Sequence, residues 1–122
     1  MKKYLFILLL FSSCIGAWDT TIDLGDGYNY YNEGGDYSEI TKQFRDINGK
    51  FVNIIIPKTI LIYTYDNDYI LAKQREKKNM KNIIQYWIII KKKDSIIGPL
   101  NKSQFMDKLK IFSIPKKLYF IK

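Results

Sequence analysis

The chain has 122 residues, a formal net charge of +8, no histidine and one cysteine. This length fits one domain and excludes a two-domain enzyme. A Cys/His zinc cluster, a Ser–His–Asp triad and an intrachain disulfide are also excluded, because the residues that they need are missing. Hydrophobic residues make up 47% of the sequence, which is typical of a folded globular chain and excludes disorder throughout.

The N-terminal residues predict an export signal. Lys2 and Lys3 form a positively charged start, and residues 4–11 are an unbroken apolar run that is too short for a spanning helix, which needs about 20 residues. Two small serines then precede Cys14, and residues 11–14 resemble the site that a lipoprotein signal peptidase recognises. We therefore expect a signal peptide over residues 1–13 and a lipid on the Cys14 thiol.

The lipid determines the expected location. The alternatives to cleavage before a lipidated Cys14 are conventional signal-peptide cleavage after Ala17 and an uncleaved anchor. An acylated Cys14 attaches the mature chain to a membrane, so we expect an exported, membrane-anchored protein of the cell envelope, at the outer membrane or the periplasmic face. Beyond the signal peptide we expect a flexible or partly stranded segment over residues 14–35 and a small β-rich domain over residues 36–122.

The fold is predicted as mainly β (α+β), an antiparallel β-meander of about six to eight strands with one short C-terminal helix packed on it. Residues 15–35 are rich in Gly and Tyr and favour two short strands. Asn48-Gly49 is the strongest hairpin signal, joining strands over residues 37–47 and 51–56. The closely spaced turns disfavour a parallel sheet, which needs longer crossovers.

The middle of the chain predicts a second hairpin, from residues 59–65 to residues 69–74. A charged loop is expected over residues 75–82. The longest strand is then expected over residues 83–92, followed by a short strand at residues 96–97.

The C-terminal part predicts the helix. Gly98-Pro99 is expected to stop the sheet, Asn101 and Gln104 have the spacing of a capping box, and Pro115 ends the helical element. A last strand is expected over residues 118–121. The residues expected to face one core share strand alternation or helical spacing: Ile54, Ile56, Ile62, Ile70, Ile88, Ile90, Phe105 and Leu109.

Charge is distributed unevenly along the chain. Residues 14–68 carry nine acids and four bases, whereas residues 69–122 carry three acids and fourteen bases. The basic runs at residues 73–81 and 91–93 are interpreted either as solvated turns or as a contact for anionic lipid headgroups, an acidic protein or an acidic envelope polymer. Nucleic acid is not expected as a partner of an exported chain. The candidate binding residues in the longer run are Lys77, Lys78 and Lys81.

Tyrosine is abundant and offers a second candidate surface. A half-buried sheet accounts for most of the tyrosines, because the residue has a high strand propensity. Tyr28, Tyr30 and Tyr31 are the group that we expect to be most exposed, and thus available for binding. Trp87 is expected in the core.

Acidic residues give no clear catalytic or metal site. Glu33, Asp36 and Glu39 are the nearest set of carboxylates for glycosidic hydrolysis, and nothing in the sequence around them marks a pocket. The other aspartates lack the spacing of a calcium loop and fit turns. We therefore expect no catalytic residues, no metal and no cofactor.

Three motifs in the second half carry a resemblance to a known family. Residues 70–74 (Ile-Leu-Ala-Lys-Gln), 86–89 (Tyr-Trp-Ile-Ile) and 98–100 (Gly-Pro-Leu) are similar to a family of small bacterial proteins of unknown function. These are commonly predicted lipoproteins, notably in Bacteroidetes-type bacteria, and the similarity covers residues 18–115. It implies export and a shared fold, but no activity.

These observations favour a lipid-anchored envelope protein that acts as a binding or interaction module. The alternative is an immunity- or inhibitor-type envelope protein. A hydrolase that uses carboxylates alone is the third and least favoured interpretation.

Overall fold

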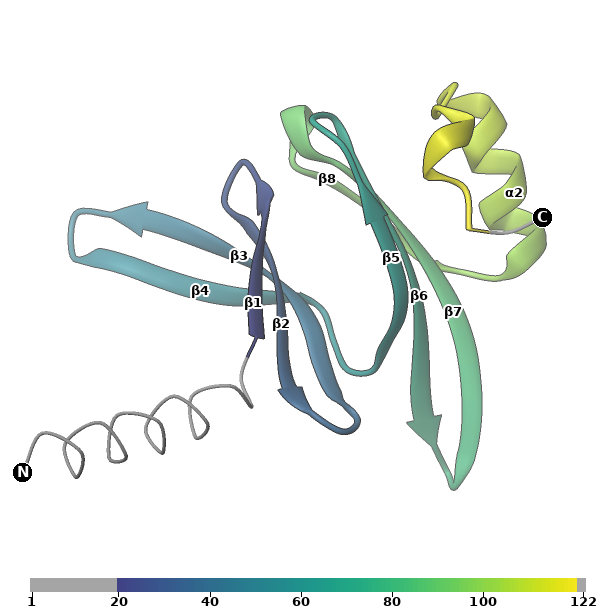
Figure 1. Cartoon of the computed structure of the whole chain (residues 1–122), viewed down its shortest axis with the longest axis horizontal. Helices are drawn as coiled ribbons and strands as arrows, with labels where there is room; N and C mark the ends of the chain where they lie inside the picture. Colours follow the sequence, from purple (N-terminus) through teal and green to yellow (C-terminus); the bar gives the residue numbers. More distant parts are fainter. Residues whose placement is uncertain (1–19, 121–122) are drawn as a thin grey trace, which may run out of the picture.

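The computed structural model describes residues 20–120, which form two antiparallel sheets and a C-terminal helix (Figure 1). The strands of the first sheet are β1 (Thr20–Gly25), β2 (Tyr28–Gly34), β3 (Tyr37–Asp46) and β4 (Gly49–Ile56). The strands of the second sheet are β5 (Ile60–Tyr65), β6 (Tyr69–Lys78), β7 (Lys81–Ile90) and β8 (Ser95–Leu100). Both sheets keep the order of the chain, so the predicted antiparallel meander is confirmed, but it is divided between two sheets.

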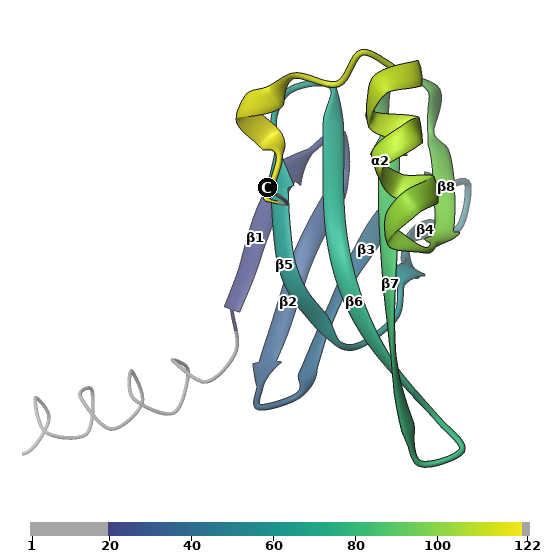
Figure 2. The ribbon, with the colours of Figure 1, turned by 90° about the vertical axis from the view of Figure 1, so that its right-hand side faces the viewer.

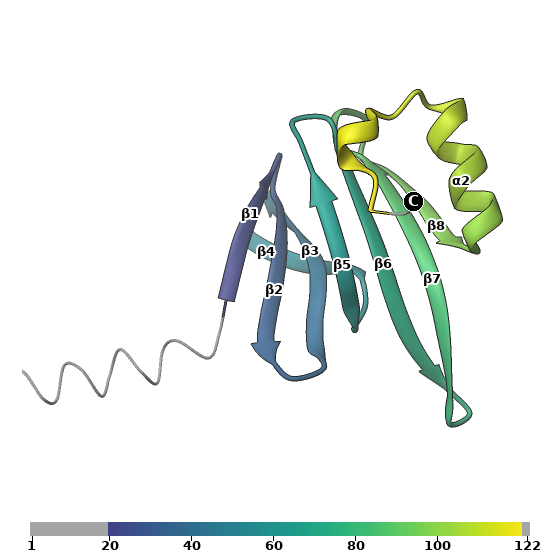
Figure 3. The same cartoon turned by 45° about the vertical axis from the view of Figure 1, so that its right-hand side comes forward.

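The helix forms a third layer. α2 (Lys102–Ile111) lies against β7 and β8 (Figure 2). The first sheet lies on the opposite side of the second sheet (Figure 3). Two short 3-10 turns, η1 (Lys91–Lys93) and η2 (Lys116–Leu118), complete the described elements. The predicted capping box is confirmed, because the Asn101 side chain accepts from the Gln104 backbone while the Gln104 side chain accepts from the Asn101 backbone.

The three layers create two cores rather than one. The core between the sheets contains Leu24, Tyr28, Ile40, Ile56, Ile60, Ile70, Ala72 and Ile89. The core under the helix contains Leu71, Tyr86, Ile88, Phe105, Leu109, Ile114 and Leu118. Successive strand residues point to opposite faces, so a middle sheet that is covered on both faces needs the uninterrupted apolar runs seen at residues 69–72 and 86–90.

The prediction of a single core is therefore wrong. Ile70 lies between the sheets, whereas Ile88 lies under the helix. Ile54 and Ile62 are 56% and 41% exposed, and neither belongs to one of the two cores. Trp87 is half-buried and packs against the core between the sheets.

The predicted charged loop over residues 75–82 is also wrong. β6 and β7 pair without interruption from Tyr69 and Ile90 to Lys78 and Lys81, so only Asn79 and Met80 form the turn. This end of the hairpin extends past the rest of the second sheet (Figure 2). Charged side chains are compatible with strands there, because they remain exposed to solvent.

Two further predictions near the C-terminus are wrong. β8 continues through Gly98-Pro99 to Leu100, because an edge strand does not need the backbone N–H that proline lacks. Instead of a strand from residue 118, the chain forms η2 and places Leu118 in the core under the helix. The carbonyl of Leu118 accepts a hydrogen bond from the Thr64 hydroxyl at 2.6 Å.

A polar cluster connects the two sheets at the turn between β7 and β8. The Tyr28 hydroxyl donates to Asp94 at 2.9 Å, and the Lys42 ammonium pairs with the same carboxylate. Lys91 is buried, and its ammonium donates to the carbonyl of Leu24 at 2.5 Å. The basic run at residues 91–93 therefore contributes one lysine to the packing of the sheets.

Candidate functional site

A hollow lined by charged side chains lies where the two sheets meet, and we call it the seam pocket. Its volume is about 610 Å³, within the range typical of small-ligand sites. The residues that line it come from the β2–β3 turn, the β4–β5 connection and β6: Gly34, Asp36, Tyr37, Pro57, Lys58, Thr59, Arg75, Glu76 and Lys77.

The backbone holds this pocket together. Thr59 and Arg75 exchange two backbone hydrogen bonds, of 3.0 and 2.8 Å, which attach the β4–β5 connection to β6. The Thr59 hydroxyl donates to the carbonyl of Asp36 at 2.5 Å and attaches the same connection to the β2–β3 turn. Residues from both sheets are thus fixed around one opening.

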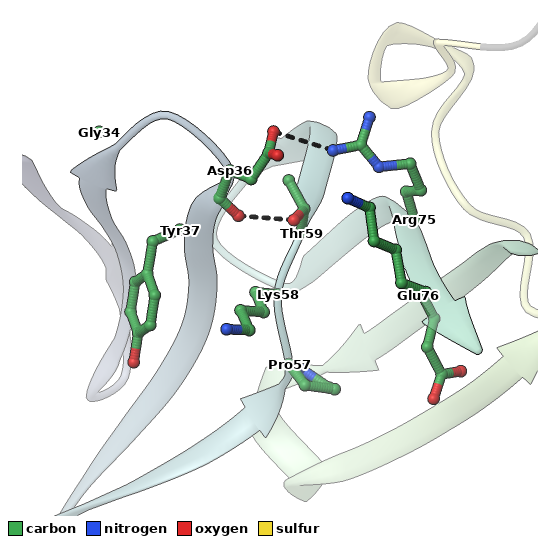
Figure 4. Close-up of a pocket in the computed structure, with 9 residues that line it drawn as sticks. Gly34, Asp36, Tyr37, Pro57, Lys58, Thr59, Arg75 and Glu76 are labelled. Atoms are coloured by element: carbon green, nitrogen blue, oxygen red, sulfur yellow. Dashed lines mark hydrogen bonds and ion pairs between the residues drawn. The ribbon is translucent and has the colours of Figure 1, made fainter. Parts of the chain in front are cut away.

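Cations dominate the charges that are free to meet a ligand. Arg75 pairs with Asp36 at 2.9 Å, and the Lys58 ammonium lies 5.2 Å from the centre of the Tyr37 ring (Figure 4). The buried Nε of Arg75 has no acceptor among residues 20–120, so Asp36 satisfies the guanidinium only in part. Asp36 is 73% exposed on its side chain, where an incoming anion can compete with it.

The second acid of the seam pocket is directed elsewhere. The Glu76 carboxylate points away from the Asp36–Arg75 pair (Figure 4), and it accepts a hydrogen bond from Gln85 at 3.1 Å. Lys58 and Lys77 are exposed. With one acid paired and the other turned away, the arrangement can hold a carboxylate, phosphate or sulfate group.

The three predicted lysines are separated by the structure. Lys77 lines the seam pocket. Lys78 and Lys81 face each other across the end of the β6–β7 hairpin, outside the pocket lining. Lys58 and Arg75 were not predicted as site residues from the sequence. Lys58 follows Pro57 in an ordinary turn, and Arg75 lies within the predicted charged loop.

The three predicted tyrosines do not form one exposed surface. Tyr28 is fully buried, so its expected exposure is wrong. Tyr30 points to the same face of β2, packs against the core between the sheets and stacks on Tyr63 with ring centres 4.3 Å apart. Tyr31 points to the other face, because side chains alternate along a strand.

Tyr31 lines a second depression, which we call the Glu39 hollow. It lies on the face of the first sheet that is turned away from the second sheet, and its volume is about 480 Å³. Its lining residues are Thr21, Asn29, Tyr31, Glu39, Thr41, Gln43 and Val52. Nothing in the sequence marked a pocket around Glu33, Asp36 and Glu39. In the structure Asp36 lines the seam pocket and Glu39 lines the Glu39 hollow. Glu33 accepts a hydrogen bond from the Tyr31 hydroxyl at 2.8 Å.

The predicted lipidation site, Cys14, lies outside the described residues. Within residues 20–120, no helix is long and apolar enough to cross a membrane. The same part of the chain contains no group of three or more acidic, His or Cys side chains that could hold a metal ion.

Comparison with protein-family models gives one match. The model described as "Protein of unknown function (DUF3997)" matches residues 25–122, which include every described strand except most of β1. The chain belongs to the DUF3997 family. Membership agrees with the resemblance to a family of unknown function and assigns no activity. Searches of curated proteins and of solved structures found no match.

Proposed function

We propose that this DUF3997 chain is an exported, lipid-anchored module of the cell envelope that binds an anionic group of its partner in the seam pocket. The partner is an acidic protein or an acidic envelope polymer. The observation that carries the binding role is the convergence of Lys58, from the β4–β5 connection, with Arg75 and Lys77, from β6, on one opening.

Charge chemistry supports an anionic ligand. The Arg75 guanidinium can present two parallel donors to a carboxylate or phosphate, although Asp36 now occupies part of it. Lys58 and Lys77 are flexible point charges that add attraction without fixed geometry. Asp36 therefore acts as an internal competitor whose removal strengthens binding.

Binding is measured by fluorescence anisotropy with a labelled hexaglutamate peptide and the full chain in detergent micelles. Each exposed charge contact contributes about 0.2–1 kcal/mol, so the Lys58→Gln/Lys77→Gln variant binds about two- to thirtyfold more weakly. The matched control, Lys78→Gln/Lys81→Gln, removes the same charge at the hairpin end and changes the affinity less than twofold. Asp36→Asn frees Arg75 and tightens binding.

Equal weakening by the two lysine pairs would show general attraction to the basic half of the chain and refute the pocket. Weaker binding by Asp36→Asn would refute the competitor role. Circular dichroism melts of all variants establish that the fold is retained.

The anchor is tested separately. The sequence from Lys2 to Cys14 supports acylation, so the parent chain incorporates a palmitate analogue in bacterial cells and Cys14→Ala does not. Equal labelling of both would refute the lipoprotein part of the proposal and leave the pocket unaffected.

A further inference from the structure

The Glu39 hollow is built by neighbouring side chains of one sheet face. In the register of the first sheet, Thr21 lies opposite Tyr31, which in turn lies opposite Glu39. Asn29 lies opposite Thr41 on the same face. Directly opposed residues have side chains that touch or nearly touch, so Tyr31 lies beside Glu39, and hydroxyl and amide groups line the rest of the hollow.

Glu39 is an unusual residue for this position. It is only 7% exposed, and within residues 20–120 it belongs to none of the ion pairs. Burial raises the pKa of its carboxyl above the usual range, the charge of Glu33 adds to this shift, and Lys58 opposes it. A desolvated carboxylate that forms no ion pair is costly, and the pairing of the surrounding strands does not require a carboxylate at this position.

The other lining groups narrow the chemistry of a ligand. Thr21, Thr41, Asn29 and Gln43 supply neutral donors and acceptors. Tyr31 adds an aromatic ring, and Val52 a short apolar side. These groups suit a small molecule that has several hydroxyls, and the Glu39 carboxylate lacks a cation in direct contact with it among residues 20–120.

We propose that the Glu39 hollow binds a small polyhydroxylated ligand with a primary ammonium group, of the amino-sugar class, and that the ammonium lies on the Glu39 carboxylate. This site is separate from the seam pocket and takes a group of opposite charge, so it does not depend on the proposed function.

The test is an NMR titration of the ¹⁵N-labelled full chain in micelles with D-glucosamine. N-acetylglucosamine and glucose are the neutral probes. Glucosamine gives saturable shifts at the amides of β2 and β3, and both neutral sugars bind at least tenfold more weakly. Glu39→Gln, which keeps the shape of the side chain, lowers the glucosamine affinity at least tenfold. Asp107→Asn makes the same charge change on the exposed side of α2 and leaves the affinity unchanged.

A second variant keeps the test informative if Glu39→Gln folds poorly. Val52 is 59% exposed, so Val52→Arg is compatible with the strand, and it adds a bulky cation to the lining of the hollow that repels the ammonium and abolishes binding. The proposal is overturned by glucosamine shifts that persist in both variants, by equal binding of the neutral sugars, or by the absence of saturable shifts up to about 50 mM, far above a millimolar Kd.

Discussion

Truncation of Phe105 on α2 tests the packing of the helix on the second sheet. The side chain is 1% exposed and lies in the core under the helix. Its ring stacks on Tyr86 with centres 4.9 Å apart and on Phe120 with centres 5.8 Å apart. Phe105→Ala therefore removes a buried ring and two aromatic contacts at once.

The expected cost follows from this burial. Truncation of a buried phenylalanine costs about 3–5 kcal/mol, and the two stacked neighbours place Phe105 in the upper half of that range. A domain of this size has a total stability of about 5–15 kcal/mol. The variant therefore keeps at most about 11 kcal/mol of this stability, and its Tm is lowered by about 15–30 °C.

Urea unfolding followed by circular dichroism and by the fluorescence of the two tryptophans, Trp18 and Trp87, measures the difference. Ile111→Ala is the matched control, because Ile111 lies on the same helix and is 66% exposed. Its effect is at most about 0.5 kcal/mol. A loss below 1 kcal/mol for Phe105→Ala, or equal losses for the two variants, would refute the described packing of α2.

Three further substitutions test other parts of the fold. Gly98→Ala places a Cβ 2.5 Å from the Trp87 ring, so it lowers the free energy of unfolding by about 1–3 kcal/mol and alters the tryptophan emission. Asn101→Ala removes the helix cap and costs about 0.5–2 kcal/mol in the same urea assay; no loss would contradict the capping box. Burial and the hydrogen bond to Asp94 raise the pKa of Tyr28. The folded state thus favours the neutral phenol, and the parent loses stability as the pH rises above about 10. Tyr28→Phe shows a smaller loss, because the raised pKa of Tyr63 still contributes to it, and the variant is about 0.5–1.5 kcal/mol less stable at pH 7.

The sequence predicted those features that depend on residues close together in the chain. The hairpin predicted from Asn48-Gly49 and the cap at Asn101 are local arrangements of backbone and side chain, and both are confirmed, although the turn is formed by Ile47 and Asn48. The mainly β fold was predicted from runs of β-branched and aromatic residues. The extension of β6 and β7 through their charged ends was not predictable from local polarity, because the pairing of the two strands determines it.

The sites were less predictable than the elements. The approach of Arg75 to Asp36 joins residues that are 39 positions apart, and it depends on how the two sheets pack. Glu39 and Tyr31 belong to one hairpin, and strand alternation alone could have placed them on a common face. The pattern that could have predicted the Glu39 hollow is the alternation that places Glu39, Thr41 and Gln43 on one face of β3.

The central position of the second sheet also affects how the molecule opens. β6 and β7 each span ten residues and pair without interruption, and residues at their centres are buried on both faces. Water reaches those backbone amides only when both covering layers separate, so their hydrogen exchange reports the global free energy of unfolding. β4 is an edge strand, and its residues 49–54 are exposed, so its outward amides exchange through local fraying. The slowest-exchanging amides of the chain thus lie in the strands that carry the Tyr-Trp-Ile-Ile and Ile-Leu-Ala-Lys-Gln motifs.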